Sequence, residues 1–195
     1  MKSIQGKIIE EFEIHQNGKN HNVVFRLPKM SDAKQAKINM DNLVKENALI
    51  SIVKKKTLSD EREWIKGMLR DIKNKKCVSL MCEVNGKLVG GAGVDIKKEG
   101  MSHIGIIGIA LQKEARGLGI GTRLLDLIMK LAKRELKTEI IELHYFKGNP
   151  AVRLYKRLGF REVGVFPKMR KRIFRIKGSS KKVEYHDQII MYKFL

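Results

Sequence analysis

The clearest pattern along the chain is a pair of largely apolar stretches on either side of Asn85-Gly86. Residues 77–84 and 87–96 each have the length and composition of a strand. Asn-Gly favours the two-residue turns that join antiparallel strands. The sequence therefore predicts a β-hairpin over residues 77–96.

A less regular version of this pattern occurs at the start of the chain. Residues 7–14 and 22–27 read as strands on either side of the turn signal Gln16-Asn17-Gly18-Lys19. We expect residues 1–21 to supply an N-terminal strand or hairpin that extends the main fold.

Two segments have the three- and four-residue spacing of amphipathic helices. The first begins at Ser31-Asp32, which can cap a helix, and runs to about Lys45. The second begins at Ser59-Asp60-Glu61 and ends before the basic stretch Lys73-Asn74-Lys75-Lys76. The apolar face of the second helix holds Trp64, Ile65, Met68, Leu69 and Ile72.

A strand, a loop, a helix and another strand follow one another in the middle of the chain. Residues 103–111 are nearly all apolar, which is typical of a central strand buried on both faces. Residues 120–137 carry apolar side chains at helical spacing, with basic residues prominent on the opposite side. Residues 139–145 complete a β-loop-α-β unit, which predicts one parallel crossover.

The last part of the chain predicts a short helix and two strands. The helix begins at Gly148-Asn149-Pro150 and ends at Leu158-Gly159-Phe160, where glycine suits the C-terminal cap. Strands are expected near residues 160–166 and 184–194. The whole pattern predicts an α+β fold whose sheet combines hairpins with the crossover.

Residues 167–182 separate these last two strands. They contain eight basic residues and no acidic ones, around Gly178-Ser179-Ser180. This composition is typical of a mobile connecting loop.

Length and composition fit one domain over residues 1–195, since 43% hydrophobic residues are enough for a substantial core. The 41 Lys and Arg residues against 21 Asp and Glu give a formal net charge of +20. Such a charge attracts acidic partners over long range. Coenzyme A, RNA, acidic protein surfaces and anionic lipid all qualify, so charge alone does not choose among them.

The cysteines and the N-terminus favour the reducing cytoplasm. Cys77 and Cys82 are five positions apart and would face opposite sides of a strand, which suits neither a zinc pair nor a local disulfide. Residues 1–13 are too polar for a signal peptide, and no apolar stretch approaches the roughly 18 residues of a membrane span. We expect a soluble protein with no metal and no membrane partner.

The run from Arg116 to Thr122 is the strongest candidate for chemistry. Glycines at 117, 119 and 121 let the backbone bend sharply and expose its N–H groups, and the helix that follows adds its positive end. A dinucleotide-binding fingerprint needs a third glycine where Thr122 stands, and a P-loop needs Gly-Lys-Ser/Thr. The loop is therefore predicted to bind an anionic group other than a dinucleotide or a nucleoside triphosphate.

These features follow in the order hairpin, buried strand, Arg-x-x-Gly-x-Gly loop, helix, strand, Asn149, and Leu154-Tyr155-Lys156-Arg157-Leu158-Gly159-Phe160. This order resembles the GCN5-related N-acetyltransferase (GNAT) superfamily, most strongly from Ile104 to Val165. The resemblance implies an α/β/α-layered α+β fold, with a mixed, mostly antiparallel sheet of about seven strands and about four helices. It also implies acetyl-CoA as co-substrate and a primary amine as acceptor.

The resemblance implies where acetyl-CoA binds. The pyrophosphate would lie on the loop, with Arg116 adding charge at its mouth. The strand before the loop would splay from its neighbour, so that its backbone pairs with the pantetheine arm, and an N–H near Leu111 would polarise the thioester carbonyl. The implied binding residues are Ile109, Ala110, Leu111, Arg116, Gly117, Leu118, Gly119, Ile120, Gly121, Thr122, Asn149 and Tyr155.

The resemblance also assigns two catalytic roles. Tyr155 matches the family tyrosine that protonates the leaving thiolate, and the alternative is an aromatic core contact. His144 stands, by its spacing to Asn149, where some protein N-terminal acetyltransferases carry a histidine base, and the alternative is a structural histidine. Asn149 would bind the pantetheine arm or cap the next helix. Its interval to Tyr155 is one residue shorter than is usual in the family, so either the helix starts one residue later or Gly148 holds the usual asparagine place.

Other positions are weaker candidates for the base that a protonated amine requires. Gly105 stands where several family members carry a glutamate base, so that solution is absent. His103 is a weaker candidate, and so is Glu142, which a regular strand would turn away from the neighbours of His144.

The acceptor amine stays open at this level. A protein or peptide N-terminus or lysine leads, with an acidic protein or peptide drawn to the basic run 168–182, and a small-molecule amine is the alternative. Residues 185–191 resemble the last strand of members that act on either kind. A module of another class would keep the fold without catalysis and bind RNA or protein through its basic surface.

Polycationic acceptors such as polyamines are disfavoured by the net charge of +20. A local acidic pocket would override that repulsion. Two clusters could form one: Glu10, Glu11 and Glu13, or Asp60, Glu61 and Glu63.

Overall fold

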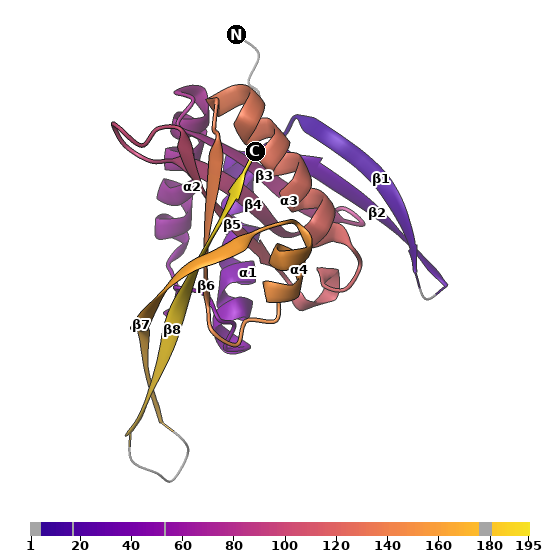
Figure 1. Ribbon diagram of the computed structural model, residues 1–195. Coiled ribbons are helices and arrows are strands. Elements are labelled where there is room, and N and C mark those ends of the chain that lie inside the picture. Colours follow the sequence, from indigo (N-terminus) through magenta and orange to yellow (C-terminus); the bar gives the residue numbers. More distant parts are fainter. Residues whose placement is uncertain (1–4, 17, 53, 176–180) are drawn as a thin grey trace.

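The computed structural model describes residues 5–16, 18–52, 54–175 and 181–195. Within these ranges the strands form one eight-stranded sheet of order β1-β2-β3-β4-β5-β6-β8-β7 (Figure 1). The strands are β1 (Ile8–Gln16), β2 (Lys19–Arg26), β3 (Cys77–Val84), β4 (Lys87–Ile96), β5 (Ile104–Leu111), β6 (Ile140–Phe146), β7 (Arg161–Arg175) and β8 (Lys181–Phe194). The α-helices are α1 (Ala33–Lys45), α2 (Leu58–Lys73), α3 (Ile120–Leu131) and α4 (Val152–Arg157). This confirms the mixed α+β fold, with the N-terminal hairpin bringing the sheet to eight strands.

Both hairpins predicted from the sequence are present. β3 and β4 pair across Asn85 and Gly86, whose φ values of 50° and 76° are those of the expected tight turn. β1 and β2 pair from Ile8↔Arg26 to Gln16↔Lys19, while Asn17 of the turn signal lies outside the described residues. The crossover is also confirmed, because β5 and β6 are parallel.

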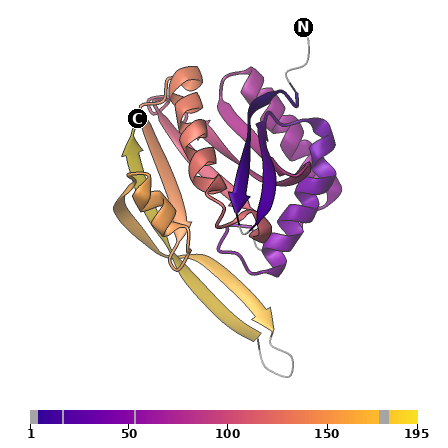
Figure 2. The same ribbon diagram turned by 90° about the vertical axis from the view of Figure 1, so that its right-hand side faces the viewer.

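The helices cover the two faces of the sheet (Figure 2). α1 packs mainly on β4 and α2 on β3, whereas α3 lies across β3, β4 and β5 on the opposite face. The main core lies under α3, where Leu80, Val94, Leu124, Ile128 and Ile141 are fully buried. Cys77 and Cys82 are buried free thiols, and burial raises the pKa of each to about 12.

β5 is less covered than its sequence predicts. Ile106 is 38% exposed on the face of α1 and α2, although Ile107 next to it is buried. The expectation that this strand is buried on both faces is therefore wrong, because α1 and α2 pack mainly on the neighbouring strands. Apolar composition alone does not reveal how far a covering helix extends.

The last two strands are longer than predicted and form an arm that leaves the body of the molecule (Figure 2). Their pairing continues from Arg170↔His186 to Arg175↔Lys181. The prediction of a mobile loop over residues 167–182 is therefore wrong for the described part, and Gly178-Ser179-Ser180 lies outside it. Lysines and arginines suit such a two-stranded ribbon because both of its faces can reach water.

A buried ion cluster fixes the start of α1. Asp32, expected with Ser31 to cap the helix, makes no side-chain cap and instead binds Arg26, at 2.9 Å to Nη1 and 2.7 Å to Nη2. Arg26 Nε also donates to Glu83 Oε1 at 2.7 Å. This cluster joins β2, β3 and the segment that leads into α1. None of the helices in the described part of the chain is long and apolar enough to cross a membrane.

Candidate active site

β5 and β6 separate part-way along their length. They pair from Ile104↔Ile140 to Ile107↔Leu143 and no further. Beyond that point β5 continues along β4 as far as Leu111, and β6 continues along β8. The edge of residues 108–111 that faces β6 thus has no strand partner in the described ranges, and we call this opening the seam. An unpaired strand edge offers N–H and C=O groups to an extended ligand.

The glycine loop lies between the end of β5 and the start of α3. Gly117 and Gly119 adopt left-handed φ values of 78° and 77°, which glycine reaches without strain. The backbone N–H groups of residues 117–121 donate no hydrogen bond within the described part of the chain. Together with the positive end of α3, these free donors give the loop the geometry and charge to bind an anion.

Gly121 allows this loop to approach the seam. A Cβ atom there would lie 3.3 Å from Leu154 Cδ2 of α4, 3.6 Å from Leu111 Cδ1 and 3.7 Å from Ile109 Cδ1. The first turn of α3 therefore packs directly against β5 and α4. This contact places the anion-binding loop at the end of the seam.

The arginines beside the loop are already paired. Arg116 Nε donates to the carbonyl oxygen of Leu111 at 2.9 Å, and its guanidinium forms an ion pair with Glu46. Arg123 donates from Nε to Glu10 Oε1 at 2.8 Å and stacks on Phe12. The positive potential of the loop thus comes from backbone N–H groups and the helix end rather than from a free Arg116.

Tyr155 of α4 lies on the α3 side of the sheet. Its ring is 5% exposed and packs between those of Tyr145 and Phe160, with centroid separations of 5.9 and 6.4 Å. Burial, followed by the nearby Tyr145, raises the pKa of Tyr155 to about 12. Its hydroxyl makes no hydrogen bond within the described residues. Tyr155 therefore keeps its proton at neutral pH and has it free to donate.

His144 of β6 lies on the other face, towards α1 and α2. Its Nε2 is 2.7 Å from Glu142 Oε1, and Lys97 Nζ donates to Glu142 Oε2 at 2.6 Å. Partial burial acts to raise the pKa of Glu142, but the hydrogen bonds from Lys97 and His144 outweigh it and lower that pKa. The expectation that Glu142 faces away is wrong, because residues two apart on a strand share a face. Glu142 orients the imidazole and leaves Nδ1 without a partner in the described chain.

The seam thus separates two sets of groups. Tyr155 and the glycine loop belong to the face of α3 and α4, and His144 with Glu142 belongs to the face of α1 and α2. Two molecules can approach this opening from opposite sides of the sheet. An extended anionic ligand fits the first face, and a group that gives up a proton fits the second.

A model of the acetyltransferase (GNAT) family matches residues 45–160. The chain belongs to this family. An N-alpha-acetyltransferase from Sulfurisphaera tokodaii is 44% identical to it over 61 residues, which are 31% of this chain. The matched part is 36% of the length of that relative.

Solved structures of acetyltransferases have the same fold. The ribosomal-protein-alanine N-acetyltransferase from Brucella melitensis superposes with a TM-score of 0.73 at 24% identity, over 88% of this chain and 99% of that one. A putative acetyltransferase from Salmonella typhimurium, solved with its cofactor acetyl-CoA, gives 0.71 at 18% identity, over 88% and 93% of the two chains.

Gly105 and His103, two positions considered from the sequence for the catalytic base, do not lie at the seam. A Cβ at Gly105 would be 2.4 Å from Val94 Cγ1, so this position points into the core and cannot hold a glutamate side chain. Ile106, on the open face, is the residue that pairs with Glu142. His103 precedes β5 at the end of the strand that is remote from the seam. This position does not support a role for His103 as the base that deprotonates the amine.

Asn149 stabilises the turn that leads into α4. Its Oδ1 accepts a hydrogen bond from the Ala151 N–H at 2.9 Å, and its Nδ2 donates to the Leu49 carbonyl at 3.4 Å. The first contact lies one turn before α4, whose N-cap residue Ala151 has no side-chain cap in the described residues, so the predicted cap is not observed. Asn149 also ties the segment between α1 and α2 to the start of α4.

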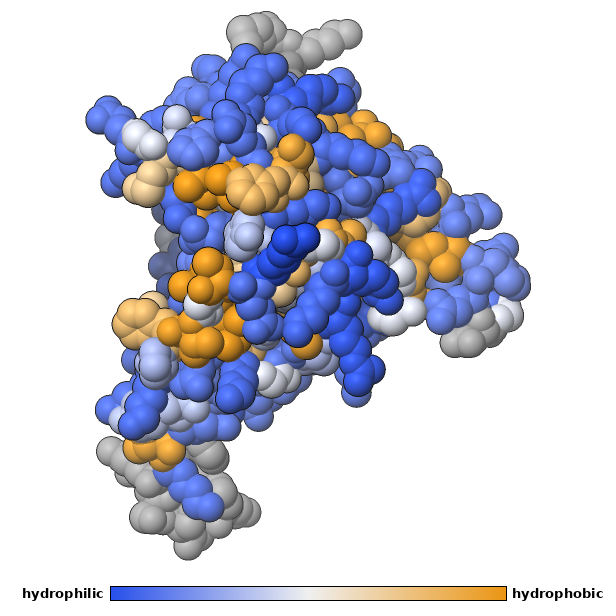
Figure 3. Space-filling view, in the orientation of Figure 1, coloured by the Kyte–Doolittle hydropathy of each residue, from blue (hydrophilic) through white to orange (hydrophobic). Residues whose placement is uncertain are grey.

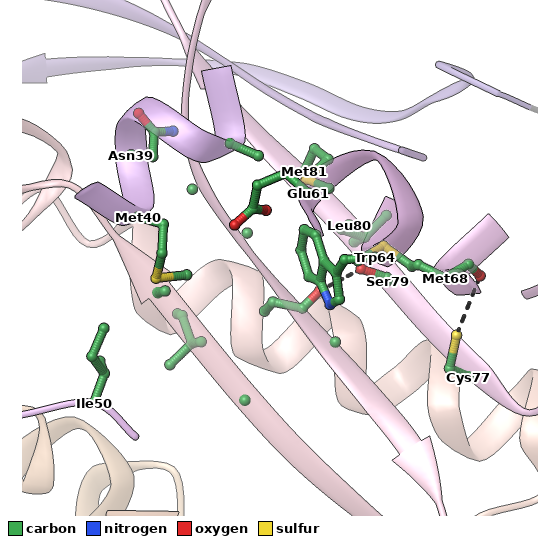
Figure 4. Close-up of a pocket in the computed structure, with 18 of the residues that line it drawn as sticks. Asn39, Met40, Ile50, Glu61, Trp64, Met68, Cys77, Ser79, Leu80 and Met81 are labelled. Carbon is green, nitrogen blue, oxygen red and sulfur yellow. Dashed lines mark hydrogen bonds between the residues drawn. The ribbon is translucent and has the colours of Figure 1, made fainter. Parts of the chain in front are cut away.

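A cavity that the sequence does not predict lies between α1, α2 and strands β3 to β5. Its volume is about 490 Å³, and Gly91, Gly93 and Gly108 are among the residues that line it on the side of the sheet. Figure 4 shows Asn39, Met40, Glu61 and Trp64 around this space. The glycine-rich run of β4 was a signal for it, since three glycines in one strand leave a bare surface. In the described residues, no group of three or more acidic, histidine or cysteine side chains is arranged to hold a metal.

One of the two acidic clusters considered from the sequence contributes to this cavity. Glu61 lines it, whereas Asp60 is held by the Thr57 cap and Glu63 is exposed. Glu10 of the other cluster is paired with Arg123. Burial raises the pKa of Glu61, opposed mainly by Lys56.

Proposed function

We propose that this protein is an acetyl-CoA-dependent N-acetyltransferase whose acceptor is the amine of a protein or peptide, in the first place an N-terminus. The observation that supports it most is the seam, whose unpaired β5 edge leads to the free N–H groups of residues 117–121. An extended arm that ends in a pyrophosphate has the shape and charge of this path. Acetyl-CoA would supply the acetyl group there as a thioester.

The donor side of the reaction uses the face of α3 and α4. The backbone of residues 109–111 pairs with the extended arm, and the loop N–H groups bind the pyrophosphate. Tyr155 donates its proton to the departing sulfur, a role for which a phenol with a pKa of about 12 is fully protonated at pH 7.

The acceptor side uses the face of α1 and α2. His144 accepts the proton of the attacking amine on Nδ1, while Glu142 holds Nε2 and Lys97 holds Glu142. The carboxylate stabilises the protonated imidazole that results. The amine can therefore approach through the seam without meeting the donor loop.

The names of two similar proteins support an N-terminal acceptor. The Sulfurisphaera tokodaii relative is an N-alpha-acetyltransferase, and the Brucella melitensis protein acts on a ribosomal-protein alanine. A small amine is the second candidate acceptor, which the cavity beside β5 supports.

Thermal denaturation with and without acetyl-CoA tests the donor site. We expect acetyl-CoA to raise the melting temperature of the wild type, and Gly119→Ala to abolish that shift. Gly100→Ala is the matched control, because Gly100 and Gly119 have φ values of 76° and 77° and open space at Cβ, and Gly100 lies in the remote β4–β5 connection. Both variants bear similar backbone strain, but only Gly119→Ala changes the loop.

An acetylation screen over N-terminal peptides, lysine peptides and free amines then identifies the acceptor. A wild-type protein that is stabilised by RNA and not by acetyl-CoA would refute the enzymatic proposal. It would favour a binding module that has lost catalysis.

A further inference from the structure

Glu61 is a largely buried acid whose side chain has no close partner in the described residues. It lies in the first turns of α2 and is 5% exposed, and its carboxylate makes no hydrogen bond or ion pair there. Lys56 and Lys37 act on Glu61 electrostatically, but neither forms an ion pair with it, and Lys37 is held by Asp41 at 2.7 Å. Leaving a carboxylate unpaired in a buried site is costly unless a cation or proton joins it.

The Glu61 carboxylate points into the cavity between α1, α2 and the sheet. Figure 4 shows it and the Trp64 ring directed into the same part of this space, with Met40 on a neighbouring wall. The other walls are mostly apolar, although Asp71 and Asp95 also line the cavity, and its volume of about 490 Å³ is that of a small-ligand pocket. A carboxylate beside an aromatic ring is a binding site for an organic cation.

The floor of the cavity connects it to the seam. Gly108 and Ala110 of β5 line the cavity, and both belong to the stretch whose other edge is unpaired. A ligand in the cavity therefore lies against the strand that we assign to acetyl-CoA. This position is suited to the molecule that receives the acetyl group.

We propose that the cavity binds the incoming acceptor as an ammonium group on an unbranched apolar chain, with Glu61 pairing with the ammonium and the chain lying on the glycine floor. The ammonium then leaves Glu61 for the seam and gives its proton to His144 before the neutral amine attacks the thioester. Two sources share this chemistry: a free alkylamine, and the first residue of a peptide with an apolar side chain. The inference names the acceptor of the proposed reaction and so rests on that function.

A local carboxylate also resolves the conflict between a cationic acceptor and the net charge of +20. The repulsion of surface lysines is screened within about 10 Å at ordinary salt, whereas a buried carboxylate at contact distance is not. Glu61 can therefore select a cation that the protein as a whole would repel. The polar atoms beside it, on Asn39 and Gln112, are bound to each other and to Leu88.

Titration calorimetry with n-hexylamine at pH 7 tests the charge, with 1-hexanol as the neutral probe of equal length. We expect Glu61→Gln to weaken hexylamine binding about tenfold or more and to leave hexanol unchanged. Glu63→Gln is the control, because Glu63 is an exposed acid on the same helix. Equal affinity of the wild type for hexylamine and hexanol, or unchanged hexylamine binding in Glu61→Gln, would overturn the proposal.

Gly108→Val tests where the apolar chain lies. A Cβ at Gly108 meets no atom within 4 Å, so the valine fits without strain and fills the floor of the cavity. We expect it to weaken hexylamine and hexanol together. Unchanged binding of both probes would place the chain elsewhere and refute the proposed position.

The same titration with methionyl-alaninamide separates the two sources. Tighter binding of the peptide than of hexylamine assigns the site to a protein N-terminus, and the reverse assigns it to a free amine. If neither binds, the proposal is wrong. These titrations measure binding to the cavity itself and do not depend on acetyl-CoA. A failure of acetyl-CoA to shift the melting temperature would therefore refute the proposed function but would not change the result of the titrations.

Discussion

Replacing Tyr155 by phenylalanine separates a catalytic hydroxyl from a structural one. The ring of Tyr155 is packed between Tyr145 and Phe160, and phenylalanine keeps those contacts. The hydroxyl makes no hydrogen bond within the described chain, so its removal leaves no protein group unpaired. We expect Tyr155→Phe to change the free energy of unfolding by less than about 0.5 kcal/mol.

The expected effect on catalysis is far larger. A positioned general acid contributes about 10²- to 10⁴-fold to a rate, which corresponds to about 3 to 5 kcal/mol of transition-state stabilisation. Tyr155→Phe should therefore lower kcat by at least 100-fold while the acetyl-CoA-induced shift in melting temperature stays. Stability is measured by urea denaturation, and kcat by acetylation of the best acceptor from the screen.

Tyr145→Phe is the matched control on the adjacent ring. Tyr145 donates a hydrogen bond to Glu162 at 3.2 Å, so its loss should cost about 1 kcal/mol of stability with little effect on kcat. The two variants thus have opposite expected signatures. A Tyr155→Phe protein that keeps its kcat, or that loses more than about 1.5 kcal/mol of stability, would contradict our assignment of the hydroxyl.

Three further predictions concern stability. Arg26→Met should destabilise the protein by about 3–5 kcal/mol in urea denaturation, because it leaves Asp32 buried without its partner; a loss below 1 kcal/mol would contradict the buried ion cluster. Arg170→Met should leave the melting temperature unchanged or raise it, since Arg170 is 7% exposed and its Nε has no hydrogen-bond partner among the described residues. A clear fall in melting temperature would show that the contact of Arg170 with His186 stabilises the protein. Because the pKa of Tyr155 is raised to about 12 in the folded protein, the unfolded chain loses the phenol proton at lower pH than the folded one. The contribution of this group to the free energy of unfolding is therefore fully present below about pH 10 and is lost between about pH 10 and 12. Tyr155→Phe should make the fall in stability over this range smaller.

The elements with local signals could be predicted from the sequence. Asn85-Gly86 specifies its hairpin through two residues that accept positive φ, and the apolar run before the glycine loop specifies β5. The arm formed by the outer parts of β7 and β8 could not be predicted. Both of its faces contact water, so its sequence lacks the alternation of apolar and polar residues that marks a half-buried strand. The exposure of Ile106 could not be predicted either, since it depends on how far α1 and α2 extend over the sheet.

In the candidate active site, too, features with a local cause could be predicted from the sequence and features that depend on distant residues could not. The free N–H groups of the loop follow from local glycine chemistry, and the sequence placed them. The pairing of Arg116 with Glu46 and the inward direction of Gly105 depend on residues far away in the chain. Glu61 was one of three neighbouring acids in the sequence, and only packing against α1 and the sheet shows which of them is buried.

The position of β8 affects how the chain can fold during synthesis. β8 lies between β6 and β7, although it is the last strand along the described sequence. Until residues 181–194 leave the ribosome, the edge of β6 has no partner, and neither does that of β7. A nascent or truncated chain would therefore expose two strand edges at once, and such edges promote pairing between molecules. Sheet completion, and with it protection from aggregation, has to wait for the final residues of this segment.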